Sequence, residues 1–159
     1  MKHSHSLERL AAVLIVVLMG LASVRAEASA CSAASVAGSW AYTYTGTIFT
    51  PNGPLPAASV GHYRQDAAGD LSGSQTRSVA GASGVEDIIG NVTVNRDCTG
   101  TGTINVLVNG ELQRTAVIAV VYDKNGNHAR YIFQSLTLPD GTNIPVVLTI
   151  DGNKMFPRN

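Results

Sequence analysis

Eight segments of the chain alternate between two kinds of side chain, and short runs rich in Gly, Pro, Asn and Asp separate them. This period of two is typical of β-strands that bury one face. Apart from an apolar run near the N-terminus, no segment keeps a helical period over more than two turns. The sequence therefore predicts an all-β domain, with strands at 38–49, 58–66, 71–80, 85–95, 100–108, 112–122, 128–138 and 143–150.

Short connections join these segments, so neighbours in the sequence should pair as antiparallel neighbours in space. Asn109-Gly110 is a signal for a type I′ hairpin turn, because both residues tolerate positive φ. The segment 51–56 holds three prolines, and we expect a loop there rather than regular pairing. Eight strands in this order predict an antiparallel up-and-down β-barrel, whose interior is filled by side chains or holds one small ligand. An open two-layer sandwich is the structural alternative.

The N-terminus has the pattern of a secretory signal peptide. Lys2 and Arg9 precede an apolar run at 10–22, which is too short to cross a hydrocarbon core of about 30 Å. Small residues follow and predict cleavage near Ala26 or Ala28, hence a secreted or periplasmic protein without a stable membrane anchor. The expected parts are a signal peptide at 1–26, an N-terminal tail at 27–37, a barrel domain at 38–152 and a C-terminal tail at 153–159.

Two cysteines, Cys31 and Cys98, follow the expected cleavage site. In an oxidising compartment such a pair usually forms one disulfide, and closing a loop of this length contributes roughly 4 kcal/mol. The alternatives are a metal site or a catalytic thiol, but there is no CxxC motif and no His or Asp pattern beside either cysteine. Lipidation of Cys31 is disfavoured by Arg25 and Glu27 before it. We therefore expect a structural disulfide, no metal site and no cofactor.

The charge balance and the absence of two catalytic motifs disfavour several classes of function for this protein. Eleven basic residues balance eleven acidic ones, which gives no electrostatic reason to bind nucleic acid or an anionic membrane. The sequence has neither the Gly-x-Ser-x-Gly motif of a serine hydrolase nor the His-Glu-x-x-His motif of a zinc protease. Catalysis that works by holding a substrate in shape needs few titratable groups, so whether the protein is an enzyme stays open.

Alternation along three of the predicted strands places candidate ligand-binding side chains on one face of each strand. These residues are Trp40, Tyr42 and Tyr44 in the first strand, Gln75 and Arg77 in the third, and Arg130 and Gln134, with Leu136, in the seventh. If the aromatic face is internal, the lumen is apolar with a few polar anchors, as small-molecule sites usually are. An arginine in such a lumen can hold a carboxylate through two parallel hydrogen bonds.

Structural roles are the alternative for these residues. Arg130 can stack on Trp40 and close one end of the barrel, while Arg77 and Gln75 can lie on a solvated face. Glu86 and Asp87 are adjacent in one strand and point to opposite faces, so they cannot form a carboxylate pair.

Two resemblances carry expectations about the fold. Gly38-Ser39-Trp40 resembles the Gly-x-Trp pattern of lipocalin-type calycins. Most of the mature chain resembles small secreted bacterial proteins with the barrel of allene oxide cyclase, in the stretches 36–47, 58–61, 66–73, 76–79 and 95–100. The resemblance implies an exported barrel, and the plant cyclase of that fold guides ring closure of an unstable fatty-acid epoxide. The resemblance does not extend to an alignment of the cyclase's catalytic residues, and we transfer none of them to this chain.

Three functions follow as hypotheses. The first is an exported barrel that binds a small apolar or amphipathic ligand in its lumen. The second is an isomerase or cyclase of the allene oxide cyclase type. The third is a filled barrel with a structural or interaction role, which a lumen packed solid with side chains would favour.

Overall fold

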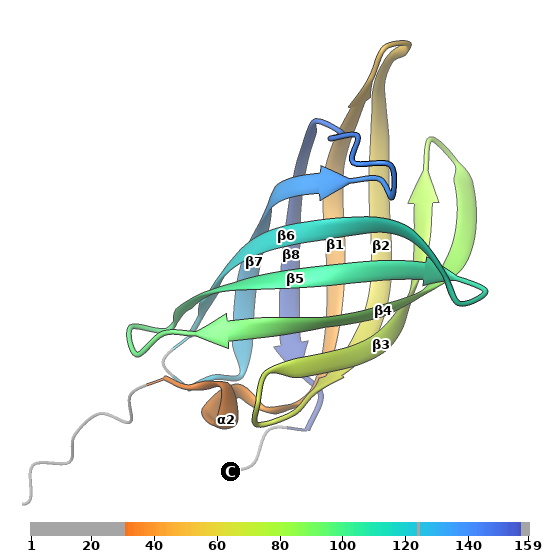
Figure 1. The fold of residues 1–159 in the computed structure, drawn as a ribbon. Helices are drawn as coiled ribbons and strands as arrows, with labels where there is room; N and C mark the ends of the chain where they lie inside the picture. Colours follow the sequence, from red (N-terminus) through yellow and green to blue (C-terminus); the bar gives the residue numbers. More distant parts are fainter. Residues whose placement is uncertain (1–30, 124, 157–159) are drawn as a thin grey trace, which may run out of the picture.

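A computed structural model of the chain describes residues 31–123 and 125–156, and these form a closed antiparallel barrel (Figure 1). The predicted signal peptide and its cleavage sites lie outside the described residues. One short helix, α2 (Ala33–Val36), precedes the barrel. The strands are β1 (Gly38–Thr50), β2 (Gly53–Gln65), β3 (Asp70–Val79), β4 (Ala82–Val94), β5 (Thr99–Val108), β6 (Glu111–Tyr122), β7 (His128–Thr137) and β8 (Val146–Lys154).

Each strand pairs with its neighbours in the sequence, and β8 returns to pair with β1 from Trp40 opposite Lys154 to Ile48 opposite Val146. The up-and-down barrel is therefore confirmed, and the open sandwich is excluded. Asn109 and Gly110 join β5 to β6 with φ values of 53° and 80°, as a type I′ turn requires. Within the described residues, no helix is long and apolar enough to cross a membrane.

The proline-rich segment differs from the prediction. β2 already begins at Gly53, and Pro54 and Pro56 pair with β1. Pairing of β2 with β3 starts only at Ala57, so the first residues of β2 have a β-strand on one side. A proline is tolerated there because its missing N–H interrupts no second ladder. The predicted loop is therefore shortened to the turn before Gly53.

The last strand is also displaced from its predicted range. β8 starts at Val146 rather than at residue 143 and continues to Lys154, beyond the expected end of the barrel domain. Pro145 lies immediately before the strand, and its carbonyl accepts a hydrogen bond from Phe49 N at 2.9 Å. The additional residues pair with the start of β1, as in Trp40 opposite Lys154, and so complete the closure of the barrel.

β7 contains an irregularity that changes which of its residues face inward. Its pairing with β6 passes over Gln134, which makes this residue a β-bulge. Leu136 consequently lines the lumen together with Tyr131. Strict alternation predicts Leu136 on the face of Arg130, and that prediction is wrong because the extra residue reverses the alternation beyond it.

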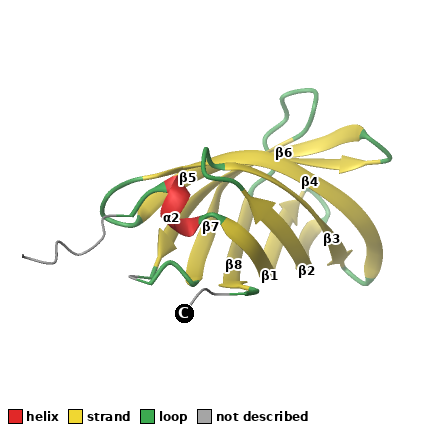
Figure 2. Cartoon of the chain, turned by 90° about the horizontal axis from the view of Figure 1, so that it is seen from below, coloured by secondary structure: helices red, strands yellow, loops and turns green. Residues whose placement is uncertain are grey.

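The two ends of the barrel differ, and we call them the helix end and the hairpin end. At the helix end, the Cys31–Cys98 disulfide ties the segment before α2 to the β4–β5 turn, which confirms the predicted pairing. Val36 of α2 is fully buried, and its carbonyl accepts a 3.1 Å hydrogen bond from Trp40 Nε1. Figure 2 views the barrel from below, where α2 lies against the strand ends. The hairpin end carries the β1–β2, β3–β4, β5–β6 and β7–β8 connections.

Candidate functional site

The interior of the barrel contains a cavity of about 90 Å³. Most of its lining side chains are apolar or aromatic: Tyr42, Tyr44, Ile48, Tyr63, Leu71, Ile88, Val92, Ile104, Val106, Ala116, Ile118, Tyr131, Phe133, Leu136, Leu148 and Ile150. Three polar side chains complete the wall, namely Gln75, Arg77 and Arg114. An apolar space with a few convergent polar groups is the usual composition of a small-molecule site.

Trp40, Tyr42 and Tyr44 all point inward from β1, but they lie at different depths. Trp40 is fully buried at the helix end, where its ring stacks on Tyr63 at 6.2 Å between centroids. The Lys154 ammonium, rather than Arg130, lies over this indole at 5.8 Å. Trp40 therefore belongs to the core that closes the helix end, whereas Tyr42 and Tyr44 line the cavity.

A group of tyrosines separates the cavity from the helix end. The hydroxyls of Tyr63 and Tyr131 are 2.6 Å apart, and the Tyr122 ring packs edge-on against both Tyr131 and Trp40. Burial raises the pKa of all three tyrosines, to about 12 for Tyr122. These side chains consequently stay neutral, and they form the floor of the cavity.

The polar part of the site is centred on Glu86, which is only 3% exposed. Arg77 Nε donates to Glu86 Oε1 at 2.8 Å, and Gln75 Nε2 donates to Oε2 at 2.8 Å. Arg114 donates from Nη1 to Oε1 at 2.9 Å and from Nη2 to Oε2, so it grips the carboxylate with both terminal nitrogens. Glu86 accepts four hydrogen bonds in total, and these occupy the acceptor capacity of a carboxylate.

Gln75 links this cluster to β1 and β2. Its Oε1 accepts hydrogen bonds from Tyr42 Oη and Ser59 Oγ, both at 2.9 Å, so its amide nitrogen is directed at Glu86. Tyr42 reaches Gln75 across β2 at Gly61, which is opposite both residues in the sheet. A Cβ at Gly61 would lie 2.8 Å from the Tyr42 ring and from Gln75 Cβ, so glycine is needed for this contact.

The electrostatics of the cluster keep Glu86 ionised. Burial by itself would raise the pKa of Glu86, but hydrogen bonds from Arg114 and Gln75 and the charges of both arginines outweigh burial and lower that pKa. Burial raises the pKa of Tyr44 to about 12, although the positive charges of Arg114 and Arg77 act to lower it. The site at neutral pH therefore contains two guanidinium groups, one carboxylate and neutral tyrosines.

Five of the seven predicted site residues face the interior: Trp40, Tyr42, Tyr44, Gln75 and Arg77. Arg130 and Gln134 do not join them, because both are exposed on the outer face of β7. Their expected place in the lumen is corrected by the burial of Tyr131 on the opposite face and by the bulge at Gln134.

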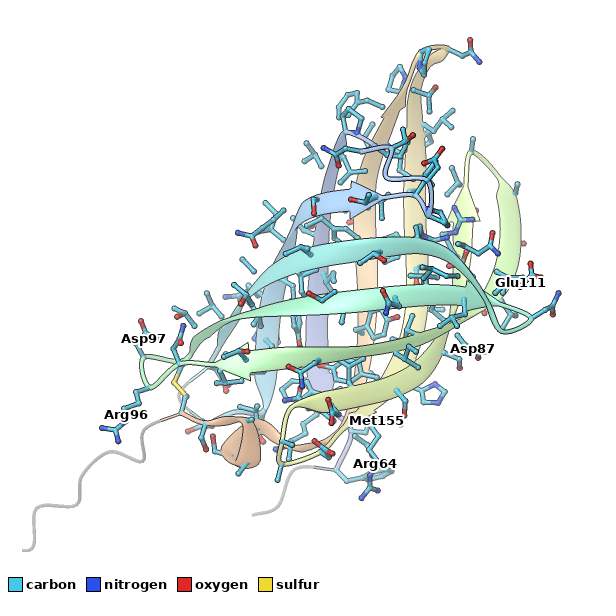
Figure 3. All side chains as sticks on the ribbon, viewed as in Figure 1. Arg64, Asp87, Arg96, Asp97, Glu111 and Met155 are labelled. Atoms are coloured by element: carbon cyan, nitrogen blue, oxygen red, sulfur yellow. A yellow bond between two sulfur atoms is a disulfide. The ribbon has the colours of Figure 1, made fainter. Side chains whose placement is uncertain are left out.

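Sequence reasoning missed Glu86 and Arg114 as members of the site. Glu86 is two residues before Ile88 in β4, and Arg114 is two and four residues before Ala116 and Ile118 in β6. Each charged side chain therefore lies on the same face of its strand as apolar residues that point inward. This spacing is the sequence signal that could have identified both residues. The prediction that Glu86 and Asp87 point to opposite faces of the strand is confirmed, since Asp87 is exposed on the outside of the barrel (Figure 3).

The described part of the chain contains no cluster of three or more His, Cys, Asp or Glu side chains able to hold a metal ion.

No family model matches the sequence, and no curated protein matches it. Among solved structures, a redesigned β-barrel is similar, with 17% identity over 78% of this chain and 95% of that chain, at a TM-score of 0.46. Rv2717c from M. tuberculosis is 12% identical over 77% of this chain and 94% of its own, at a TM-score of 0.34.

Proposed function

We propose that this protein is an exported barrel that binds a small amphipathic ligand in its lumen. The observation that carries the proposal is the apolar cavity inside the barrel, with Gln75, Arg77 and Arg114 gathered on its wall. A barrel filled for stability alone does not need a buried Glu86 paired with two inward-facing arginines, because replacing buried ion pairs with well-packed apolar side chains is often neutral or stabilising.

The size of the cavity limits the ligand. About 90 Å³ is less than the roughly 150 Å³ of an engineered protein cavity that binds benzene. The part of a ligand that the cavity holds is therefore compact, a few carbon atoms of an acyl chain rather than a complete ring. A longer chain extends toward the open hairpin end or requires side chains in the wall to move.

Access is from the hairpin end. Arg77 and Arg114 have side chains that are 31% and 14% exposed, so the polar wall of the cavity is in reach of solvent. The opposite end is closed by fully buried Val36 and Trp40. An amphipathic ligand would accordingly enter with its apolar part first and leave its polar part beside the arginines.

Export is part of the proposal and has two supports. The N-terminal sequence has the pattern of a signal peptide. The Cys31–Cys98 disulfide is compatible with an oxidising compartment, such as the periplasm or the extracellular space.

A cyclase of the allene oxide cyclase type is the second candidate, and it is supported by the sequence resemblance and the closed barrel. The state of Glu86 favours a binder over an acid–base enzyme. A carboxylate with a lowered pKa that already accepts hydrogen bonds from Gln75, Arg77 and Arg114 is poorly suited to take a proton from a substrate.

A cavity-filling substitution tests the proposal. Ala116 lines the cavity on β6, so Ala116→Leu places extra carbon atoms in it, while Ala119→Leu makes the same change on the outer face of the same strand. We expect 1-hexanol, used as the amphipathic probe in an NMR titration, to bind the wild type and Ala119→Leu and to lose affinity for Ala116→Leu. Equal binding by all three proteins, or no binding by the wild type, would contradict a lumen site.

A further inference from the structure

We infer that the head group recognised in this cavity is a carboxylate and that the terminal nitrogens of Arg77 bind it. This inference rests on the proposed function and specifies the chemical class of the ligand. It is carried by the hydrogen bonds and charges of one cluster, formed by Gln75, Arg77, Glu86 and Arg114.

The cluster presents positive charge to the lumen. Two arginines face one glutamate, which leaves an excess of one positive charge. Arg77 and Arg114 line the cavity, whereas Glu86 is 3% exposed and is not part of the lining. A ligand in the cavity therefore contacts the guanidinium groups rather than the carboxylate.

Hydrogen-bonding capacity is also unequally distributed. Arg114 uses both terminal nitrogens on Glu86, and the amide of Gln75 is engaged at both its oxygen and its nitrogen. Arg77 uses only Nε on Glu86, and its two terminal nitrogens make no hydrogen bond to any residue in 31–123 or 125–156. The donors that remain for a ligand are thus the planar pair at the tip of Arg77.

A carboxylate fits this pair in both geometry and charge. The terminal nitrogens of an arginine match the two oxygens of a carboxylate through parallel hydrogen bonds. One carboxylate also neutralises the single excess charge. A phosphate monoester carries roughly −1.5 to −2 at pH 7 and would leave a negative excess beside buried Glu86.

The test compares hexanoate with 1-hexanol, which have the same chain length and different head groups. NMR titration measures both affinities and shows from the same spectra that each variant is folded. We expect the wild type to bind hexanoate at least about tenfold more tightly than 1-hexanol, the effect of a charge-assisted hydrogen bond. In Arg77→Gln this preference disappears while 1-hexanol still binds.

Three further variants separate recognition from stability. Arg130→Gln makes the same substitution on the outer face and should keep the preference. Arg77→Lys keeps the charge without the paired donors and should show an intermediate preference, which keeps the inference testable if Arg77→Gln does not fold. Glu86→Gln removes the competing carboxylate and should tighten hexanoate binding, a result that a purely structural role for the cluster does not produce.

Each outcome either supports or overturns the inference. If wild-type protein binds 1-hexanol and hexanoate equally, or if Arg77→Gln keeps the preference, the carboxylate assignment is wrong and the lumen site remains. If the wild type binds neither probe, the proposed function fails and takes the inference with it.

Discussion

The substitution Glu86→Gln removes the charge that holds Arg77 and Arg114 together and leaves the size of the side chain almost unchanged. In place of one carboxylate oxygen, an amide NH₂ then faces guanidinium donors. Breaking a buried ion pair by removing one partner costs about 3–5 kcal/mol. Because Arg77 is 31% exposed and Arg114 is 14% exposed, water solvates part of the remaining charge. We therefore expect the free energy of unfolding to fall by about 3 kcal/mol, at the lower end of this range.

The effect should depend on pH with a defined sign. The pKa of Glu86 is lowered in the folded protein, so its contribution to stability is complete above its unfolded value near 4.5. This contribution is lost as the pH falls through the folded pKa. The difference between the wild type and Glu86→Gln should accordingly be largest at neutral pH and shrink in acid.

Urea unfolding of the oxidised protein, followed by the fluorescence of buried Trp40, measures this difference. Asp87→Asn is the matched control, because it makes the same carboxylate-to-amide change at the next residue, on the exposed face. The control should lie within about 0.5 kcal/mol of the wild type. A loss below about 1 kcal/mol for Glu86→Gln, or equal losses for both variants, would refute the description of Glu86 as a buried and paired charge.

Three other predictions concern the barrel itself. Replacing Cys31 and Cys98 together with serine should lower the free energy of unfolding in urea by about 4 kcal/mol, because the bridge spans 67 residues; no change would deny it a stabilising role. Burial raises the pKa of all five tyrosines above 10.0, namely Tyr42, Tyr44, Tyr63, Tyr122 and Tyr131. The free energy of unfolding should therefore be unaffected by these groups below pH 10 and should fall as the pH rises above it. Ultraviolet absorbance should therefore show tyrosinate only as the protein unfolds in alkali, and a separate titration of the folded protein near pH 10 would contradict this burial. Gly61→Ala should lower the thermal stability by the equivalent of about 1–3 kcal/mol, whereas Gly84→Ala should not, because a Cβ at Gly84 would lie in open space. Equal effects of the two substitutions would refute the steric argument.

The barrel could be predicted from the sequence because its determinants are local. Alternation identified each strand within a few residues, and the Asn109-Gly110 turn has the φ values that its residue types favour. The errors arose where tertiary context decides. Pro54 and Pro56 are accommodated because β3 does not extend alongside them, and no feature of their own sequence shows where β3 ends.

The candidate site was less predictable than the fold. Period-two alternation groups residues by face but does not show which face is inside, so Arg77 and Arg130 looked equivalent in the sequence. The structure places Arg77 at the cavity and Arg130 on the outside. Glu86 and Arg114 come from β4 and β6, on either side of β5, and their contact depends on how these three strands pair rather than on any spacing in the sequence.

The central claim is that the lumen holds a small ligand with a carboxylate head. Its most direct test is the intact mass of the protein, exported through its own N-terminal segment and compared under native and denaturing conditions. We predict an additional mass in the native spectrum alone, equal to that of a small monocarboxylic acid and absent from Ala116→Leu. An adduct that Ala116→Leu retains, or a native spectrum with no adduct even after incubation with hexanoate, would contradict the account.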